Sequence, residues 1–381
     1  MKTKKIALIG STGSVGRQVL EVLERNPSIA KAVSLCANTN AELLSAQAHK
    51  YKPEAVCLAG GQSGLDLPDG VKCYYGREGA FNCITEDTDL VFVAVSGFAG
   101  LEIVLDAIEK KKDVALANKE ALVAGGEIVM RKAKENGVKI IPVDSEHSAI
   151  WQCLNFREDG FESLILTASG GPFRSYTREQ LRTVTPEQAL RHPNWHMGAK
   201  ITVDCATMLN KGFEVIEAHH LFNAPTSKIE VLIHPQSTVH SMVRFSDGSV
   251  MAEMSTPSML QPIQIALTYP ERLPLKIAPL DLASLGKLEF YKVEKQAYPC
   301  FDLAISALKG GGTTPCALNA ASEVAVKAFL AGRIAFTDIA EVIEKTLSEI
   351  PSQKAELEAI KQTDISARQI ATDIIAGEYI K

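Results

Sequence analysis

The sequence predicts an α/β fold in its first part, followed by an α+β region and a small bundle of C-terminal helices. Three observations support this prediction. Short apolar runs alternate with amphipathic segments up to about residue 142, as in a parallel α/β sheet. Strands of alternating polarity with a hairpin signal follow, and residues 300–381 have helical periodicity.

The strands of the predicted parallel sheet consist of aliphatic and β-branched residues at 6–9, 32–36, 55–58, 90–95, 113–117 and 139–143. Nearly continuous apolar strands are expected where helices cover both faces of a sheet. Helices are predicted in the gaps, at 16–25, 41–50, 101–111 and 120–135. The last of these ends at Asn136-Gly137, a pair typical of helix C-termini.

Beyond residue 144, the segments 161–168, 228–234 and 239–245 have the alternation of antiparallel strands, and Asp247-Gly248 predicts a hairpin to 249–254. A proline-rich stretch without periodicity follows, and then helices at 317–330, 336–347 and 354–376. We therefore divide the chain into a parallel α/β domain (1–145), an α+β domain (146–268), a linker (269–299) and a helical domain (300–381).

Composition excludes several classes of protein. The 381 residues, 46% hydrophobic and 22% charged, indicate an ordinary folded chain of two or three domains. A net charge of −5 without a basic stripe argues against nucleic-acid binding, and no apolar run reaches the ~18 residues of a membrane span. We expect a cytoplasmic protein, and its eight cysteines, which include no C-x-x-C pair, to be free thiols.

The first strand leads directly into Gly10-Ser11-Thr12-Gly13-Ser14-Val15-Gly16, which opens a helix. Glycines here permit a tight turn and a close approach of the backbone to a pyrophosphate at the helix N-terminus. The spacing is G-x-x-G-x-x-G instead of G-x-G-x-x-G, and a merely structural turn is the alternative. Strand, loop and helix in this order predict a Rossmann-like dinucleotide site.

The second strand is followed by Ala37-Asn38-Thr39-Asn40, where a carboxylate would select NAD. These neutral residues place no negative charge against a 2′-phosphate, so the sequence favours NADPH. The tetrad contains no Arg or Lys. The preference therefore depends on a missing repulsion and not on a cationic clamp.

Carboxylates gather where the last predicted strand ends. Asp144 and Glu146 are two residues apart, so on an extended chain both would point the same way, and Glu214 is a third candidate. Oxygen ligands suit Mg²⁺ or Mn²⁺. Spacing alone leaves open a solvated strand end, and we expect His147, His219 and His220 to be packed or solvated instead of ligating.

The motifs, taken in their order along the chain, resemble the 1-deoxy-D-xylulose 5-phosphate reductoisomerase family. No single motif is decisive, whereas their joint order is specific and extends over essentially the whole chain. They lie at 10–16, 116–120, 142–147, 169–174, 192–198, 210–214, 234–237 and 319–323.

The resemblance implies an NADPH- and metal-dependent enzyme that rearranges 1-deoxy-D-xylulose 5-phosphate and reduces the product to 2-C-methyl-D-erythritol 4-phosphate. It implies that 1–145 binds NADPH and that 146–268 is the catalytic domain, with a lid at 189–199. It also implies metal ligands at Asp144, Glu146 and Glu214, and catalytic roles for these residues with Lys119 and His192. Substrate contacts are implied for Lys119, Ser145, Glu146, Ser169, His192, Trp195, Met197, Cys205, Asn210, Lys211 and Glu214. Cofactor contacts are implied for Ser11, Thr12, Gly13, Ser14, Val15, Ala37, Asn38, Asn40, Asn118, Glu120 and Gly198.

Family members form homodimers, and we expect one here. Cys205 departs from the family, in which the matching residue is usually a serine that donates to the substrate phosphate. Two other functions remain open at this stage. A semialdehyde dehydrogenase would use a nucleophilic cysteine such as Cys153 or Cys205, and an NADP-binding sensor would use the fold without catalysis.

Overall fold

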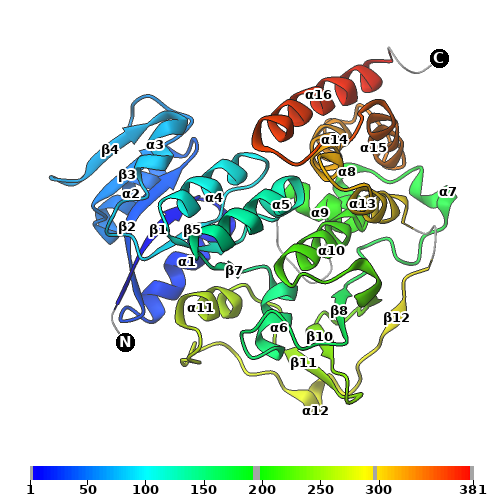
Figure 1. Cartoon of the computed structure of the whole chain (residues 1–381), viewed down its shortest axis with the longest axis horizontal. Coiled ribbons are helices and arrows are strands. Elements are labelled where there is room, and N and C mark those ends of the chain that lie inside the picture. The colour runs from blue at the N-terminus through cyan, green and yellow to red at the C-terminus, as the bar shows by residue number, and fades with distance from the viewer. Residues whose placement is uncertain (1–2, 192–197, 295–297, 378–381) are drawn as a thin grey trace. The chain divides into compact units, whose positions relative to one another are not determined.

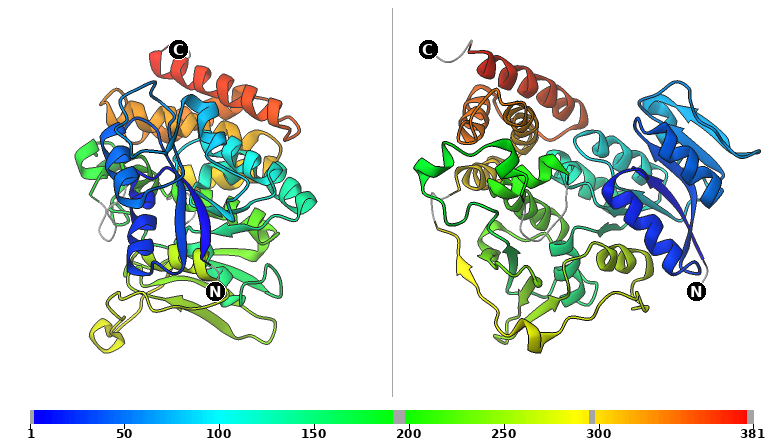
Figure 2. Two further views of the ribbon diagram at one scale, coloured as in Figure 1. Left: turned by 90° about the vertical axis from the view of Figure 1, so that its left-hand side faces the viewer. Right: turned by 180° about the vertical axis from the view of Figure 1, so that it is seen from behind.

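The computed structural model describes residues 3–191, 198–294 and 298–377 (Figure 1, Figure 2). The chain forms two compact units. The first unit comprises Met1–Ala121, Val129–Ser148 and Ser258–Ala278. The second unit comprises Leu122–Ile128, Ala149–Pro257 and Pro279–Lys381. The four-domain division drawn from the sequence stays a prediction.

The first unit contains a parallel sheet in the order β4-β3-β2-β1-β5-β6-β7, which confirms the predicted α/β class (Figure 1). Its central strands are almost wholly buried, in agreement with their continuous apolar sequences. The strands are β1 (Lys4–Ile9), β2 (Ala30–Ala37), β3 (Ala55–Leu58), β4 (Lys72–Tyr75), β5 (Leu90–Val93), β6 (Asp113–Leu116) and β7 (Ile140–Pro142).

Helices connect these strands. They are α1 (Ser14–Arg25), α2 (Ala41–Tyr51), α3 (Gly76–Asn82), α4 (Ala99–Glu109) and α5 (Lys119–Asn136). A later helix, α11 (Leu260–Thr268), packs against α1 and β7, and Asn26 Nδ2 donates to Gln264 Oε1 of α11 at 2.7 Å. The sequence did not predict β4 or α3, because β4 is a largely exposed edge strand and α3 contains two glycines.

The second unit contains a mixed sheet in the order β11-β10-β8-β9-β12. The β10–β11 hairpin at Asp247-Gly248 is confirmed, but β8 and β9 are parallel and not antiparallel as expected. A long crossover with several helices joins β8 to β9, which permits the parallel direction. The strands are β8 (Ser163–Ala168), β9 (Ile229–Ile233), β10 (Val239–Arg244), β11 (Val250–Met254) and β12 (Tyr291–Lys292).

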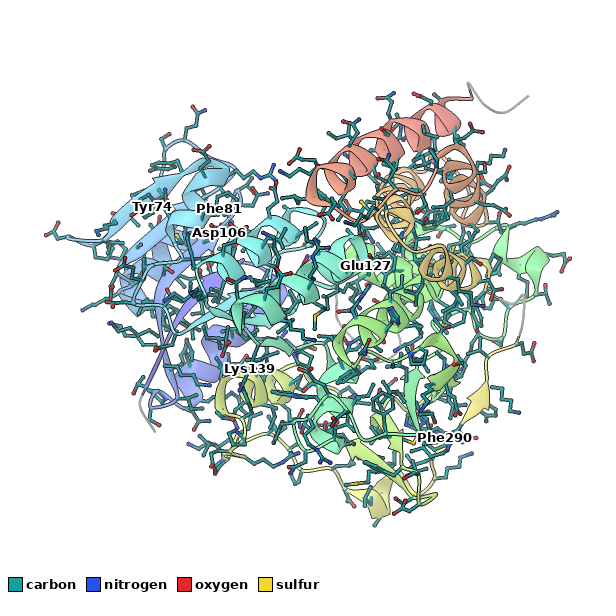
Figure 3. All side chains as sticks on the ribbon, viewed as in Figure 1. Tyr74, Phe81, Asp106, Glu127, Lys139 and Phe290 are labelled. Carbon is teal, nitrogen blue, oxygen red and sulfur yellow. The ribbon has the colours of Figure 1, made fainter. Side chains whose placement is uncertain are left out.

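Part of the predicted linker belongs to this sheet. Strand β12 pairs with β9, and Phe290, labelled in Figure 3, stacks on the His234 ring with centroids 4.7 Å apart. The shorter segments of the second unit are α7 (Arg178–Leu181), α8 (Pro186–Ala189), η1 (Thr226–Lys228) and α12 (Leu282–Leu285).

The C-terminal helices of the second unit confirm the predicted bundle. Ala317 and Ala320 of α14 and Ala367 of α16 form a buried cluster, and these small side chains let the two helices pack closely. The longer helices of this unit are α6 (Ser145–Cys153), which begins in the first unit, α9 (Ala199–Ala206), α10 (Leu209–Leu221), α13 (Pro299–Gly310), α14 (Thr314–Leu330), α15 (Asp338–Glu349) and α16 (Leu357–Ala376). Within the described ranges, no helix has both the length and the apolar character that a bilayer crossing needs.

Candidate active site

The glycine loop lies between β1 and α1 in the first unit. Gly10 has φ +99°, and a Cβ there would lie 2.5 Å from Ala94 O, so the turn requires glycine. The N–H groups of Gly10 and Ser11 donate to Cys36 O at 2.8 and 2.9 Å, and these two hydrogen bonds attach the loop to the end of β2. Gly13 is the N-cap of α1 and makes no side-chain capping hydrogen bond. The N-terminus of a helix favours an anion in general.

The predicted cofactor tetrad follows β2, and its asparagines are exposed. Asn40 caps α2 by accepting from Leu43 N at 3.0 Å, so it fixes the start of that helix. Asn38 lies against Gly60, where a Cβ would collide with the Asn38 side chain. The end of β2 thus offers neutral amide groups and no carboxylate to a bound ribose.

Asn118 and Glu120 form a hydrogen-bonded brace between β6 and the loop after β5. Asn118 accepts from Ala121 N as the N-cap of α5 and donates to Val95 O at 3.1 Å and Glu120 Oε2 at 3.0 Å. Glu120 Oε1 accepts from Gly97 N at 3.0 Å. This bracing role was not visible in the sequence, although an Asn before a helix is a cap signal.

Lys119 and Asp144 form a nearly buried ion pair in the first unit, with Nζ 3.0 Å from Oδ2. His147, fully buried, places Nδ1 3.5 Å from Asp144 Oδ1. Burial by itself would raise the pKa of Asp144, but Lys119 and His147 hold the pKa of that carboxyl well below its usual range. Asp144 is therefore an anion with a fixed ammonium beside it.

The expected geometry of Asp144 and Glu146 was wrong. Strand β7 ends at Pro142, and Ser145 already begins α6, so the two carboxylates do not share a face of an extended chain. Asp144 precedes the helix and accepts from Glu146 N at 3.3 Å, as an N-cap residue does. Ser145 Oγ donates to Glu146 Oε2 at 2.6 Å. The carboxylates are adjacent because of a helix cap and not because of strand periodicity.

In the second unit, Asn210, Lys211 and Glu214 lie on one face of α10, as their spacing of three and four residues requires. Glu214 is 1% exposed. Its Oε1 accepts from Asn210 Nδ2 at 2.5 Å, and its Oε2 pairs with Lys211 Nζ. A buried carboxylate is thereby held beside an amide and a cation.

The loop after β8 brings a second set of predicted residues together. Gly170 and Gly171 have φ +80° and +69°, and Gly171 N donates to Ser169 Oγ at 3.2 Å. A Cβ on Gly171 would lie 2.7 Å from Cys205 O, so this loop packs directly on α9. Ser169 and Cys205, both predicted at the phosphate end, therefore belong to one packed substructure.

The predicted lid is only partly described. His192, Trp195 and Met197 lie outside the described residues. Gly198 is the N-cap of α9, and its carbonyl accepts from Thr202 Oγ1 at 2.8 Å. The contact predicted for Gly198 with the cofactor stays a prediction.

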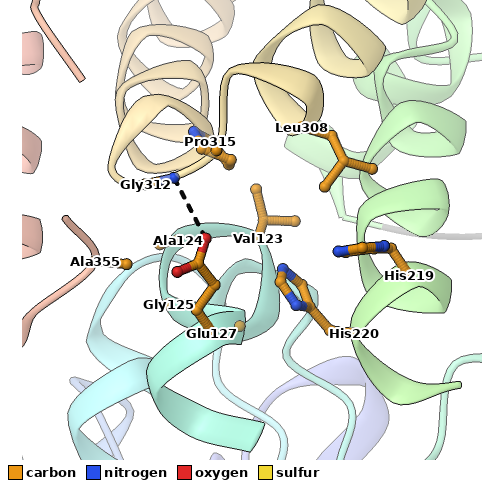
Figure 4. Close-up of a pocket in the computed structure, with 12 residues that line it drawn as sticks. Val123, Ala124, Gly125, Glu127, His219, His220, Leu308, Gly312, Pro315 and Ala355 are labelled. Atoms are coloured by element: carbon orange, nitrogen blue, oxygen red, sulfur yellow. Dashed lines mark hydrogen bonds between the residues drawn. The ribbon is translucent and has the colours of Figure 1, made fainter. Parts of the chain in front are cut away.

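A small cavity of the second unit lies beside the kink of α5, where Gly125 has non-helical angles (Figure 4). His219 and His220 line it, and Gly312 N donates to Glu127 Oε1 at 3.3 Å across it. Burial, with a smaller contribution from His219, lowers the pKa of His220 to about 3. The cavity contains none of the predicted catalytic residues.

The predicted site residues are divided between the units. The glycine loop, the tetrad, Lys119 and the residues from Asp144 to Glu146 belong to the first unit. Ser169, Cys205 and the α10 residues belong to the second unit. The first group contains the glycine loop before α1 and an ammonium–carboxylate pair, and the second contains polar donors beside a carboxylate. The roles assigned to these residues stay predictions.

Comparisons with known proteins cover the whole chain. A family model described as 1-deoxy-D-xylulose 5-phosphate reductoisomerase matches residues 6–126, and models of the C-terminal domains of this enzyme match 140–222 and 254–370. The reductoisomerase of Desulfitobacterium hafniense is 48% identical over 98% of this chain and 99% of its own length. That of Moorella thermoacetica is also 48% identical, with the same coverage.

Solved structures agree with the curated relatives. The reductoisomerase of Zymomonas mobilis in complex with NADPH is 38% identical, has a TM-score of 0.91, and is matched over 98% of this chain and 99% of that one. A reductoisomerase in complex with NADPH, fosmidomycin and magnesium is 37% identical, with a TM-score of 0.92 and coverage of 98% of both chains.

Proposed function

Because this chain belongs to the 1-deoxy-D-xylulose 5-phosphate reductoisomerase family, we propose that its acidic and glycine-rich elements perform that enzyme's reaction. The chain is an NADPH- and divalent-metal-dependent enzyme that converts 1-deoxy-D-xylulose 5-phosphate into 2-C-methyl-D-erythritol 4-phosphate, a non-mevalonate isoprenoid precursor. The observation that carries this conclusion is 48% identity along the whole chain. It replaces the dehydrogenase and sensor interpretations.

Asp144, Glu146 and Glu214 are the proposed metal ligands, with Mg²⁺ or Mn²⁺ as the ion. The donor set fits a hard cation because it consists of carboxylate oxygens, and the structure keeps Asp144 ionised beside Lys119. Asp144 and Glu146 belong to the first unit, and Glu214 belongs to the second. The bound ion supplies Lewis acidity for the oxyanion that forms during carbon–carbon cleavage, and NADPH supplies the hydride.

The protein's own groups bind and orient the substrate. Lys119 would place its ammonium group near the substrate oxygens that the metal ion binds. The ion pair with Asp144 fixes the position of this ammonium group. Ser145 would hydrogen-bond the substrate backbone. Ser169, Cys205, Asn210 and Lys211 bind the phosphate through hydroxyl, thiol, amide and ammonium groups. His192, Trp195 and Met197 cover the substrate in this proposal and exclude water.

The glycine loop is proposed to hold the NADPH pyrophosphate through Ser11, Thr12, Gly13, Ser14 and Val15. Ala37, Asn38 and Asn40 would surround the adenosine ribose, and contacts on the nicotinamide side are proposed for Asn118, Glu120 and Gly198. Support comes from the steric need for glycine at Gly10 and from the absence of carboxylates in the tetrad. A homodimer and a cytoplasmic location, both expected from the sequence, are part of the same proposal.

The direct test is the oxidation of NADPH with 1-deoxy-D-xylulose 5-phosphate by chelator-stripped protein, before and after addition of Mg²⁺ or Mn²⁺. We expect oxidation only with metal. Glu214→Gln should lower kcat by at least about 100-fold, the range seen when an electrostatic stabiliser is removed. Glu127→Gln is the matched control, because Glu127 lies at the α5 cavity. Metal-independent turnover, or equal losses in both variants, would contradict the proposed ligand set.

A further inference from the structure

Three cysteine thiols gather on one face of the first unit's sheet, beside α3. Cys36 lies at the end of β2, Cys57 lies in β3, and Cys83 follows α3. The Cys57 thiol donates to Gly76 O at 3.6 Å, and its interactions with the Cys36 and Cys83 thiols lower its pKa. All three residues are at most 3% exposed. The catalytic proposal uses none of these thiols.

We propose that Cys36 and Cys57 are a peroxide-sensitive dithiol whose oxidation to a disulfide weakens NADPH binding. The effect on NADPH rests on the proposed cofactor site, whereas formation of the disulfide is independent of it.

The sheet holds the two thiols in a position to bond. Cys36 and Cys57 are directly paired in the parallel ladder of β2 and β3. Neighbouring strands lie about 4.8 Å apart, which is within the ~4.4–6.8 Å between Cα atoms that a disulfide spans. Directly paired residues also present their side chains to the same face of the sheet. Cys83, in contrast, is in the covering segment and moves with it.

The short helix α3 covers the thiols of Cys36 and Cys57. Helix α3 has seven residues, among them Gly76 and Gly79, and it packs on β3 and β4 (Figure 1). Strand β4 is the edge of the sheet and is largely exposed. Short, glycine-containing edge segments open locally at low free-energy cost. Such opening would expose Cys57 and Cys36 while the ladder keeps them together.

Cys57 is the thiol that reacts first. The hydrogen bonds from Cys36 and Cys83 lower its pKa, and the thiolate is the nucleophile. Its sulfur attacks one peroxide oxygen and breaks the O–O bond, which gives a sulfenic acid and water. The Cys36 sulfur then attacks the sulfenic sulfur and releases a second water. Two thiols are oxidised by two electrons, and one hydrogen peroxide is reduced to two waters.

The disulfide would affect the cofactor site through the backbone of Cys36. Its carbonyl oxygen accepts the N–H groups of Gly10 and Ser11, and Ala37 begins the cofactor tetrad. A disulfide imposes its own dihedral geometry on the Cys36 side chain and backbone, which would shift this acceptor relative to the glycine loop. We therefore expect the Kd for NADPH to rise about fivefold, the effect of losing roughly one hydrogen bond.

The experiment uses the full-length Cys73→Ser protein, because Cys73 is exposed and would be oxidised independently. The protein is treated with hydrogen peroxide and then alkylated. Peptide mapping should find the Cys36 and Cys57 peptides cross-linked, with a loss of two hydrogens. NADPH titration without substrate or metal should show the weaker Kd, and dithiothreitol should restore it.

Two variants separate the possible outcomes. Cys57→Ser, whose hydroxyl can still donate to Gly76 O, should bind NADPH normally and should not respond to peroxide, whereas Cys83→Ser should still form the disulfide. A Cys57–Cys83 cross-link, or no cross-link, would overturn the proposal, as would a disulfide that leaves the NADPH affinity unchanged. If the reduced protein fails to bind NADPH, the cofactor assignment fails, and the cross-link is then judged by mass alone.

Discussion

Among single residues, Cys205 lies where the family resemblance implies a serine. Its thiol is proposed to donate to the substrate phosphate, and its carbonyl supports the Ser169 loop. A thiol is a weaker and longer hydrogen-bond donor than a hydroxyl. If the proposed contact is made, the thiol limits phosphate affinity, whereas the contact of the Cys205 carbonyl with the Ser169 loop does not depend on the side chain.

Cys205→Ser should lower the KM for 1-deoxy-D-xylulose 5-phosphate about fivefold, because one neutral hydrogen bond contributes about 1 kcal/mol. The KM for NADPH should be unaffected. Steady-state kinetics at saturating Mg²⁺ measures both constants. Cys153→Ser, at a buried thiol of α6, serves as the control and should change neither. An unchanged or higher KM for the substrate would refute the proposed role.

Single residues of the proposed site also show what could not be predicted from the sequence. The types of residue at Asp144, Glu146 and Glu214 predicted their grouping by charge, but the geometry of the first two depends on a helix cap. Capping is decided by where β7 ends, which periodicity cannot locate within one or two residues. The Asn118–Glu120 brace also escaped prediction, because its acceptors lie on the loop after another strand.

Among the elements, the loop after β8 is the one whose backbone most constrains the proposed phosphate site. Gly171→Ala should destabilise the protein and raise the substrate KM. The φ of this residue is +69°, and the Cβ that alanine adds would lie 2.7 Å from Cys205 O. Gly137→Ala is the matched control, with φ +67° and open space around it. It should cost only about 1 kcal/mol of backbone strain and leave the KM unchanged. Thermal unfolding and kinetics measure the two effects, and equal changes in both variants would argue against the contact.

Helix α10 carries a partly buried histidine, His220, whose shifted pKa makes stability depend on pH. Folding lowers the pKa of His220 to about 3, whereas an unfolded histidine titrates near 6.5. The unfolded chain binds the extra proton between these values, so stability is complete above about pH 6.5 and falls as the pH decreases. Between pH 7.5 and pH 5.5 this amounts to about 1.4 kcal/mol.

Urea unfolding at the two pH values checks this expectation. His220→Asn should remove most of the His220 contribution to the difference, while His49→Gln, at an exposed position of α2, should leave it in place. Persistence of the full difference in His220→Asn would contradict the assignment.

Elements were predicted where local sequence decides them. The apolar strands of the first unit and the helices of the C-terminal bundle follow from periodicity, and β3 was predicted with its observed bounds. The predicted antiparallel direction of β9 relative to β8 was wrong. A long crossover sets the direction of this strand, and the residues of the strand itself do not. The short strand β12 lies in a segment whose prolines indicated a linker, and its pairing with β9 is a nonlocal interaction.

For the whole molecule, we expect a homodimer in solution. Sedimentation equilibrium should give about twice the chain mass of 41.2 kDa at micromolar concentration. Addition of Mg²⁺ and NADPH should not change this value. A mass of one chain across the concentration range would contradict the expectation.

The order of the chain has a consequence for how the protein is made. Helix α11 packs on α1 and β7, yet it is synthesised only after residues 149–257 of the other unit. At a translation rate of about 5–20 residues per second, the ribosome needs on the order of ten seconds to extend from residue 148 to 278. During that interval the nascent first unit lacks a helix whose residues are nearly all buried in the finished protein. During synthesis, the apolar surface that α11 later covers is therefore exposed for seconds. A nascent-chain chaperone would bind in this period.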